Sequence, residues 1–156
     1  MTNTGTTKVR LSPPPPELMR LINPVVRRVL TTRSLGSRIR RQGMVEFTGR
    51  RTGRTLRIPV CLHHVGEETL IFTERPWRHN LTGGAPVTIT HRGQTRHGRA
   101  VLVDAAPERV GAAMRAAMDD GASPFELGLK VTRGYDPTAD DLAVIARSII
   151  RVDFED

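Results

Sequence analysis

The stretch with the most distinctive chemistry runs from Phe47 to Val60, where two alternating apolar segments flank a loop rich in glycine and arginine. Gly49 and Gly53 allow positive φ and a close approach of the backbone to a ligand. Hydroxyl groups or positive charges are supplied in and beside the loop by Thr48, Thr52, Thr55, Arg50, Arg51, Arg54 and Arg57. Backbone amides and guanidinium groups together favour capture of a phosphate or carboxylate at the end of a hairpin. The alternative interpretation is a solvated basic turn.

The distribution of charge bears on the kind of partner. The net charge of +8 indicates an anionic partner, which is a nucleic acid, a membrane surface or a phosphorylated small molecule. Between Arg27 and Arg57 the arginines are opposed by Glu46 alone, whereas the C-terminal third is acidic or balanced. A protein that holds single-stranded nucleic acid usually interleaves aromatic side chains with basic ones. Because this chain offers little beyond Trp77 and Tyr135 for stacking, we expect no nucleic-acid partner.

Cysteine content and hydropathy bear on the compartment. The single Cys61 excludes an internal disulfide and is typical of a reducing cytosol. No segment reads as a signal peptide, and none approaches the ~20 apolar residues that span a bilayer. We therefore expect a cytoplasmic protein. A basic amphipathic helix predicted over residues 17–30, with Pro24 as a kink, either packs on its own domain or contacts a membrane surface, so peripheral membrane association is the alternative.

The rest of the chain divides into two parts. Residues 1–16 are polar and Thr-rich and end in the polyproline run Pro13–Pro16, so we expect a disordered N-terminal segment. Residues 17–156 are expected to form a single domain. Alternating patterns predict six strands, and these cover residues 44–48, 56–63, 70–72, 86–91, 95–103 and 148–154.

Helices are predicted around these strands. A helical turn or two begins at Pro76, a helix covers Pro107 to Asp120, and a last helix begins near Asp136, while residues 122–135 are ambiguous. Pro59 lacks a ladder donor and therefore indicates an edge strand or a bulge. The pattern predicts an α+β protein: a small barrel of about six mostly antiparallel strands with peripheral helices.

Familiar catalytic motifs are missing from the sequence. It contains no nucleophile elbow, no P-loop and no Gly-x-Gly-x-x-Gly dinucleotide motif. His63 and His64 are adjacent and would face opposite sides of a strand, and no other histidine has metal-ligand spacing with a cysteine. The sequence therefore predicts no metal site and identifies no catalytic side chain. If the protein is an enzyme, a bound cofactor must supply the chemistry.

Several motifs in order resemble the deazaflavin-dependent nitroreductase family. They are Gly49-Arg50-Arg51-Thr52-Gly53-Arg54, Arg57-Ile58-Pro59-Val60, Trp77-Arg78-His79-Asn80-Leu81 and Gly83-Gly84-Ala85-Pro86-Val87, preceded by Asn23-Pro24-Val25-Val26-Arg27. The resemblance extends from about Leu21 to Val103. It implies a split β-barrel like that of flavin-binding oxidoreductases, which binds the deazaflavin coenzyme F-420, or FMN in related branches. It also implies a homodimer with the cofactor at the subunit interface.

The resemblance further implies which residues contact the cofactor. The loop and the arginine after it would hold the phosphate and acidic tail, and Trp77 and Asn80 would lie beside the ring system. The complete set is Thr48, Gly49, Arg50, Arg51, Thr52, Gly53, Arg54, Arg57, Pro59, Trp77, Asn80 and Leu81. For Trp77 a core position, and for Asn80 the bonding of backbone groups at a helix end, are the alternatives. In many members the loop that corresponds to Thr73–Pro76 is longer and helps enclose the deazaflavin. Some members also have a hydrogen-bond donor to the substrate near the C-terminus, for which Tyr135 is a candidate here.

The expected activity is transfer of a hydride between reduced coenzyme F-420 and a small apolar acceptor, a quinone or a nitroaromatic. The alternatives are an FMN-dependent reductase and a split-barrel protein that holds a cofactor, haem or lipid without turnover.

Overall fold

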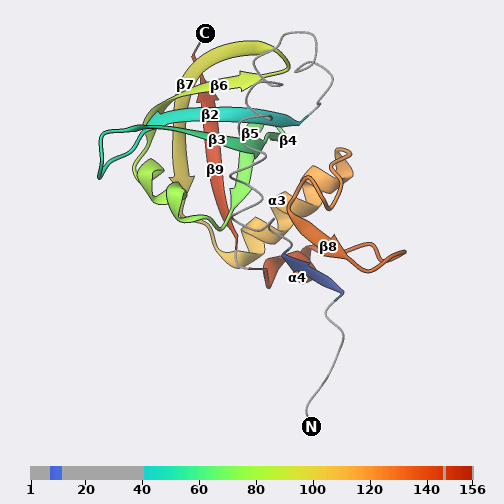
Figure 1. Cartoon of the computed structure of the whole chain (residues 1–156). Helices are drawn as coiled ribbons and strands as arrows, with labels where there is room; N and C mark the ends of the chain where they lie inside the picture. Colours follow the sequence, from blue (N-terminus) through green and yellow to red (C-terminus); the bar gives the residue numbers. More distant parts are fainter. Residues whose placement is uncertain (1–7, 12–40, 146, 156) are drawn as a thin grey trace.

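The computed structural model describes residues 8–11, 41–145 and 147–155 (Figure 1). The helix predicted over residues 17–30 lies outside the described residues. The described elements, in order, are β1 (Val9–Leu11), β2 (Gln42–Thr48), β3 (Thr55–Cys61), β4 (His63–Val65), β5 (Glu68–Thr73), the 3-10 helix η1 (Pro76–Leu81), β6 (Ala85–His91), β7 (Gln94–Val103), α3 (Pro107–Asp119), β8 (Leu129–Val131), α4 (Ala139–Ala143) and β9 (Ser148–Phe154).

Seven of these strands form one curled antiparallel sheet in the order β3-β2-β6-β7-β9-β5-β4. Its two edge strands, β3 and β4, are consecutive in the chain with only Leu62 between them. The predicted single strand over 56–63 is therefore wrong, because the chain pairs with β2 up to Cys61 and with β5 from His63. The amide of Leu62 donates to the carbonyl of Arg41 at 2.7 Å at this corner. The α+β split-barrel prediction is confirmed, and the edge position of Pro59 in β3 is confirmed with it.

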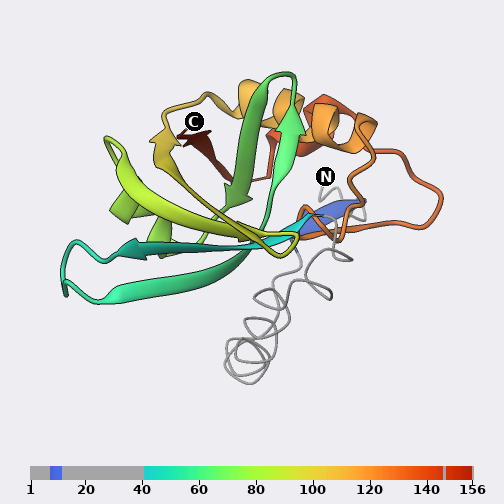
Figure 2. The ribbon, with the colours of Figure 1, turned by 90° about the horizontal axis from the view of Figure 1, so that it is seen from above.

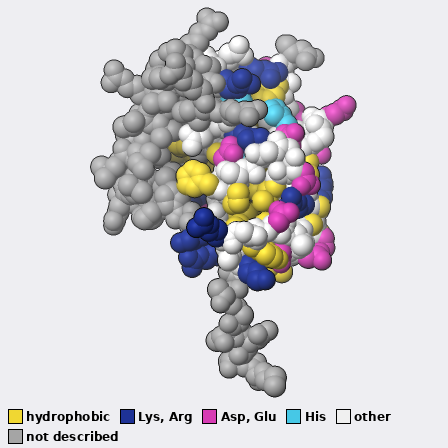
Figure 3. Space-filling model, turned by 90° about the vertical axis from the view of Figure 1, so that its right-hand side faces the viewer, with side chains coloured by type: hydrophobic (Ala, Val, Ile, Leu, Met, Phe, Trp, Pro, Cys, Tyr) yellow, Lys and Arg dark blue, Asp and Glu magenta, His cyan; other side chains and the backbone are white. Residues whose placement is uncertain are grey.

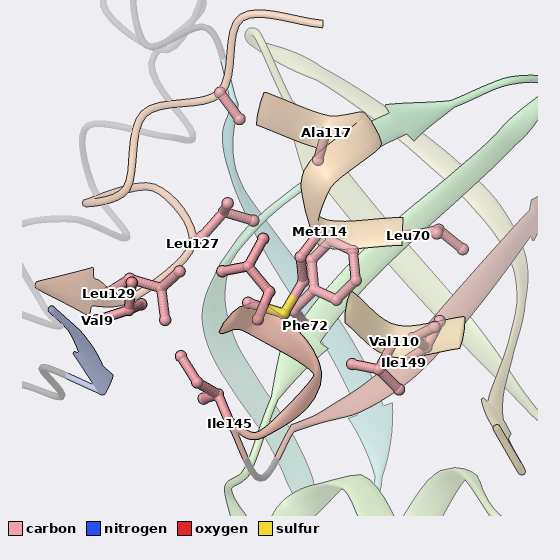
Figure 4. Packing of buried hydrophobic residues seen from close by; sticks show 12 residues of the cluster. Val9, Leu70, Phe72, Val110, Met114, Ala117, Leu127, Leu129, Ile145 and Ile149 are labelled. Atoms are coloured by element: carbon pink, nitrogen blue, oxygen red, sulfur yellow. The ribbon is translucent and has the colours of Figure 1, made fainter. Parts of the chain in front are cut away.

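Two apolar clusters pack on the two faces of this sheet. One lies inside the curl and includes Val45, Ile89 and Ile150, and the other lies between the sheet and the helices. Strand β5 serves both, because Ile71 points into the curl while Phe72 packs against Met114 of α3 and its neighbours (Figure 4). This double burial explains why three consecutive residues of β5, Leu70, Ile71 and Phe72, are apolar.

Helices α3 and α4 cover the outer side of the barrel at the end opposite the β2–β3 loop (Figures 1 and 2). Val110, Met114 and Ala117 form the buried stripe of α3. Gly111 lets α4 approach α3 closely, because a Cβ on it would lie 2.4 Å from the carbonyl oxygen of Ala139. The close contact holds the short helix α4 in place.

Strand β1 pairs with β8 in a separate two-stranded ribbon, in which Val9 lies opposite Val131. Val9 is buried in the cluster beneath the helices. The expectation of disorder for residues 1–16 is therefore wrong for Val9–Leu11, and the rest of that segment lies outside the described residues. Three-residue strands far apart in the chain leave no alternating pattern long enough to predict the pairing.

A partly buried polar junction joins the β3–β4 corner to the segment that follows α3. Arg41 forms a salt bridge with Glu126 at 3.3 Å and donates to the carbonyl of Asp120 at 3.0 Å. His63 lies beneath this pair, is 2% exposed, and has no hydrogen-bond partner for Nδ1 among the described residues. Burial, followed by the nearby Arg41 charge, lowers the pKa of His63 from 6.5 to about 4.

The junction predicts a specific pH dependence of folding stability. The unfolded chain binds a proton at His63 near pH 6.5 and the folded chain only near pH 4. The free energy of unfolding is therefore highest above pH 6.5, and about 3 kcal/mol of it is lost as the pH falls to about 4. Urea unfolding from pH 7 to pH 4 should show a smaller loss in His63→Gln than in the wild type, with the exposed neighbour His64→Gln as control. Equal losses in all three proteins would contradict the prediction.

Candidate functional site

The β2–β3 loop is a tightly closed turn. The amide of Gly49 donates to the carbonyl of Arg54 at 2.8 Å, and the amide of Gly53 donates to the carbonyl of Gly49 at 2.9 Å. Gly53 has φ of 68°, which favours glycine there. Thr48 and Thr55 form the last strand pair below the loop. The two predicted glycines therefore close the turn.

Asn80 attaches this loop to η1. Its Oδ1 accepts from the amide of Arg50 at 2.9 Å, and its Nδ2 donates to the carbonyl of Trp77 at 2.9 Å. The guanidinium of Arg50 also donates to the carbonyl of Thr82, just beyond η1. Because both ends of the Asn80 amide are engaged, the side chain serves as a brace between two segments 30 residues apart. This matches the alternative in which Asn80 bonds backbone groups.

Trp77, Leu81 and Pro59, which were also predicted to contact the cofactor, have mixed surroundings. Trp77 is half-buried, and its ring lies 5.8 Å from that of Phe47 at an interplanar angle of 34°. Leu81 is fully buried inside the curl. Pro59 is half-buried on the edge strand opposite Met44. Trp77 and Leu81 thus anchor η1 to the barrel, which fixes the position of the brace.

The arginines in and beside the loop differ in whether their guanidinium groups already have ion-pair or hydrogen-bond partners. Arg57 forms an exposed pair with Glu46 at 2.7 Å, and Arg50 is engaged with η1. The guanidinium groups of Arg51 and Arg54 are exposed and form no ion pair within the described part of the chain. The amides of Gly49, Arg50, Gly53 and Arg54 already donate inside the protein, the last to Thr52 Oγ1 at 3.3 Å. An anion at this loop would therefore be held mainly by the side chains of Arg51 and Arg54.

A polar cleft of about 340 Å³ begins at the base of the loop and crosses the outer face of the sheet. The register of the strands brings its lining residues together, because Glu46 lies opposite Thr88, and Thr88 lies opposite His97. Its lining also includes Thr48, Thr55, Pro86, Gly98 and Glu155. Sequence reasoning placed only Thr48 and Thr55 near a site. Alternation indicates that Glu46, Thr88 and His97 face outward, but only the register brings them together.

A second, more apolar cleft of about 260 Å³ lies between α3 and the β4–β5 hairpin and is lined by Val65, Leu70, Ala112, Ala113, Ile149, Glu68 and Arg109. On the side of the molecule that carries α3 and β8, acidic and basic side chains are interspersed around apolar ones (Figure 3). The β2–β3 loop, whose Arg51 and Arg54 form no ion pair with any described residue, is the better place for an anionic ligand.

Tyr135 lies away from this region. It packs against the cluster beneath the helices, where its hydroxyl donates to Asp141 and the Lys8 ammonium lies 4.7 Å from its ring centroid. The bond to Asp141 raises the pKa of the tyrosine hydroxyl. Tyr135 is thus engaged elsewhere.

The described residues contain neither a cluster of metal-binding side chains nor a membrane-spanning helix. Within residues 8–11, 41–145 and 147–155, no group of three or more His, Cys, Asp or Glu side chains is placed to hold a metal ion. None of the helices in these ranges has the length and apolar character needed to cross a membrane.

Comparison with known proteins supports the fold. No protein-family model and no curated protein matches this chain. A candidate 5-nitroimidazole antibiotic resistance protein from Bacteroides thetaiotaomicron matches in structure with a TM-score of 0.51 at 11% identity, over 96% of this chain and 84% of that chain. A protein described as a domain-swapped dimer gives 0.50 at 11% identity, over 87% and 99%. An F-420 reductase gives 0.44 at 18% identity, over 83% and 92%. The first two likenesses show the fold alone, and membership of the deazaflavin-dependent nitroreductase family stays a prediction.

The Asn80 brace can be tested directly. Asn80→Ala removes the acceptor for the Arg50 amide and the donor to the Trp77 carbonyl, so we expect about 1–2 kcal/mol of lost stability and faster hydrogen exchange of the Arg50 amide. Asn80→Asp keeps an acceptor for that amide and should preserve more of its protection. Exchange rates at Arg50 that are the same in all three proteins would show that Asn80 does not hold the loop.

Proposed function

We propose that the protein binds the deazaflavin coenzyme F-420 and transfers a hydride from it to a small acceptor. One observation carries the proposal: the guanidinium groups of Arg51 and Arg54 form no ion pair with any described residue, and they lie on a loop whose backbone Asn80 holds against η1. Two guanidinium groups on a fixed loop backbone suit the phosphate and carboxylates of an acidic tail.

The residues present fit the tail of such a coenzyme. Arg51 and Arg54 would hold its anionic groups, while Arg50 keeps the loop in place through Thr82. When bound, the deazaflavin would supply hydride transfer, which no described side chain can perform. The cleft that begins at Thr48 and Thr55 offers space next to the loop. The candidate nitroimidazole resistance protein has the same fold, which supports the proposal as regards fold only.

FMN is the second candidate, because its phosphate would find the same two guanidinium groups at the loop. The Asn80 brace and the charges of Arg51 and Arg54 do not distinguish the phosphate of FMN from that of coenzyme F-420. The two are separated by titrating each coenzyme in turn.

Binding of the anionic tail predicts the effect of removing each charge. Arg51→Ala and Arg54→Ala should each weaken coenzyme binding by about 1–3 kcal/mol, which is roughly 5- to 150-fold in Kd. Arg133→Ala, in the turn after β8, removes the same charge away from the loop and should leave Kd unchanged. Fluorescence-quench titration with coenzyme F-420, and separately with FMN, measures all four proteins.

Each outcome has a distinct meaning. Tight binding of FMN with weak binding of the deazaflavin would show that the coenzyme is FMN and not F-420. Binding of neither, or equal losses in the Arg133→Ala control, would contradict the proposal that the loop holds a phosphorylated coenzyme.

We also propose that the protein is a homodimer. Strand β3 is an edge of the seven-stranded sheet, and a partner could cover it beside the outer-face cleft. Light scattering during size exclusion should give twice the protomer mass of 17.3 kDa. A mass of one protomer at micromolar concentration would contradict the dimer.

A further inference from the structure

The outer-face cleft contains one side chain of a type suited to proton transfer. His97 lies in β7 opposite Thr88, and its Nδ1 lies 3.2 Å from the Thr88 hydroxyl oxygen. In the protonated imidazolium both ring nitrogens are donors, so Nδ1 donates to the Thr88 hydroxyl oxygen and Nε2 keeps a proton of its own. The bond to Thr88 thus orients the ring and leaves its other nitrogen for a ligand.

The backbone around His97 is fixed by its neighbours. The amide of Glu155 donates to the carbonyl of His97 at 3.0 Å. The next residue, Gly98, lies so close to β9 that a Cβ on it would be 2.5 Å from the carbonyl oxygen of Asp153. These contacts position the base of the His97 side chain, although the ring itself is exposed to solvent.

The other groups in the cleft make His97 the proton donor by elimination. Besides Phe47, Pro86, Val87 and Gly98, the cleft is lined by threonine hydroxyls, two carboxylates and this imidazole, and of these polar side-chain types only imidazole changes its charge between pH 5 and 8. Glu46 is already paired with Arg57. Reduction of a carbonyl by a hydride requires a proton on the oxygen, and a positioned acid speeds such a step.

We propose that this cleft receives the acceptor and that His97 protonates it. The inference rests on the proposed function and specifies its acceptor as a quinone-type molecule whose carbonyl oxygens accept hydrogen bonds from His97 and the neighbouring threonines. The bound coenzyme would supply the hydride, and His97 would supply the proton that the reduced oxygen takes up, which together account for a two-electron reduction of the acceptor. Solvent then returns the proton to the exposed imidazole. Of the two acceptors that the sequence suggested, a quinone or a nitroaromatic, the threonine hydroxyls and the imidazole of this cleft favour the quinone.

The chain offers a matched control for this role. His64 is also exposed, lies opposite a threonine in a strand pair, and has its Nδ1 3.4 Å from the Thr69 hydroxyl oxygen. His97→Asn and His64→Asn therefore remove similar groups from similar surroundings. With 1,4-naphthoquinone as acceptor, we expect kcat to fall about 100-fold or more in His97→Asn and to be unchanged in His64→Asn.

Two further readouts separate proton donation from a structural role. The wild-type kcat should decrease as the pH rises through the range in which imidazole loses its proton, and His97→Asn should lose this decrease. The groups that share the cleft with His97, namely Glu46 with its partner Arg57, and Glu155, are the same in both proteins. In the protein without coenzyme, 1,4-naphthoquinone should shift the NMR signal of the His97 ring and not that of His64.

The possible results distinguish this inference from the proposed function. An unchanged affinity for coenzyme F-420 with the loss of kcat supports it. Normal kcat in His97→Asn, or a loss of kcat that is entirely due to weaker coenzyme binding, overturns it and leaves the reductase intact. Failure of the wild type to bind either coenzyme overturns the proposed function and this inference together.

Discussion

The change of strand partner at Leu62 is the constraint on which the rest of the structure depends. Because β3 pairs with β2 and β4 pairs with β5, the two edge strands of the sheet are consecutive in the chain. Their direct connection through Leu62 keeps the sheet curled. The curl gives the sheet an inner face, which is filled by side chains such as Val45 and Ile150, and an outer face that divides into two parts. One part of the outer face is covered by α3 and α4, and the other carries the polar cleft.

The candidate site combines this scaffold with a loop whose position is set from outside itself. Hydrogen bonds within the loop close the turn, and the bond from the Arg50 amide to Asn80 fixes the position of the turn relative to η1. Rigid placement matters because an exposed ion pair contributes little when its side chains must first be ordered. The brace fixes the backbone that carries Arg51 and Arg54, which on the proposed function would bind an anion, and the strand register places His97 in the adjoining cleft.

The sequence predicted those features that depend on local patterns. Alternation identified β2, β6 and β9, Pro59 indicated an edge, and Gly49 and Gly53 marked the turn. The break at Leu62 was not predictable, because the alternation of inward and outward residues continues through it. The bond between Asn80 and Arg50 and the assembly of Glu46, Thr88 and His97 depend on residues that are 30 or more positions apart or on different strands. Such contacts follow from tertiary register and leave no local signal.

The most direct test of the central claim is a crystal structure of the protein with coenzyme F-420. The account predicts that an anionic group of the coenzyme lies within hydrogen-bond distance of the Arg51 or Arg54 guanidinium, with the Asn80 bond to Arg50 intact. A coenzyme bound instead in the cleft between α3 and the β4–β5 hairpin, with Arg51 and Arg54 still exposed, would contradict it.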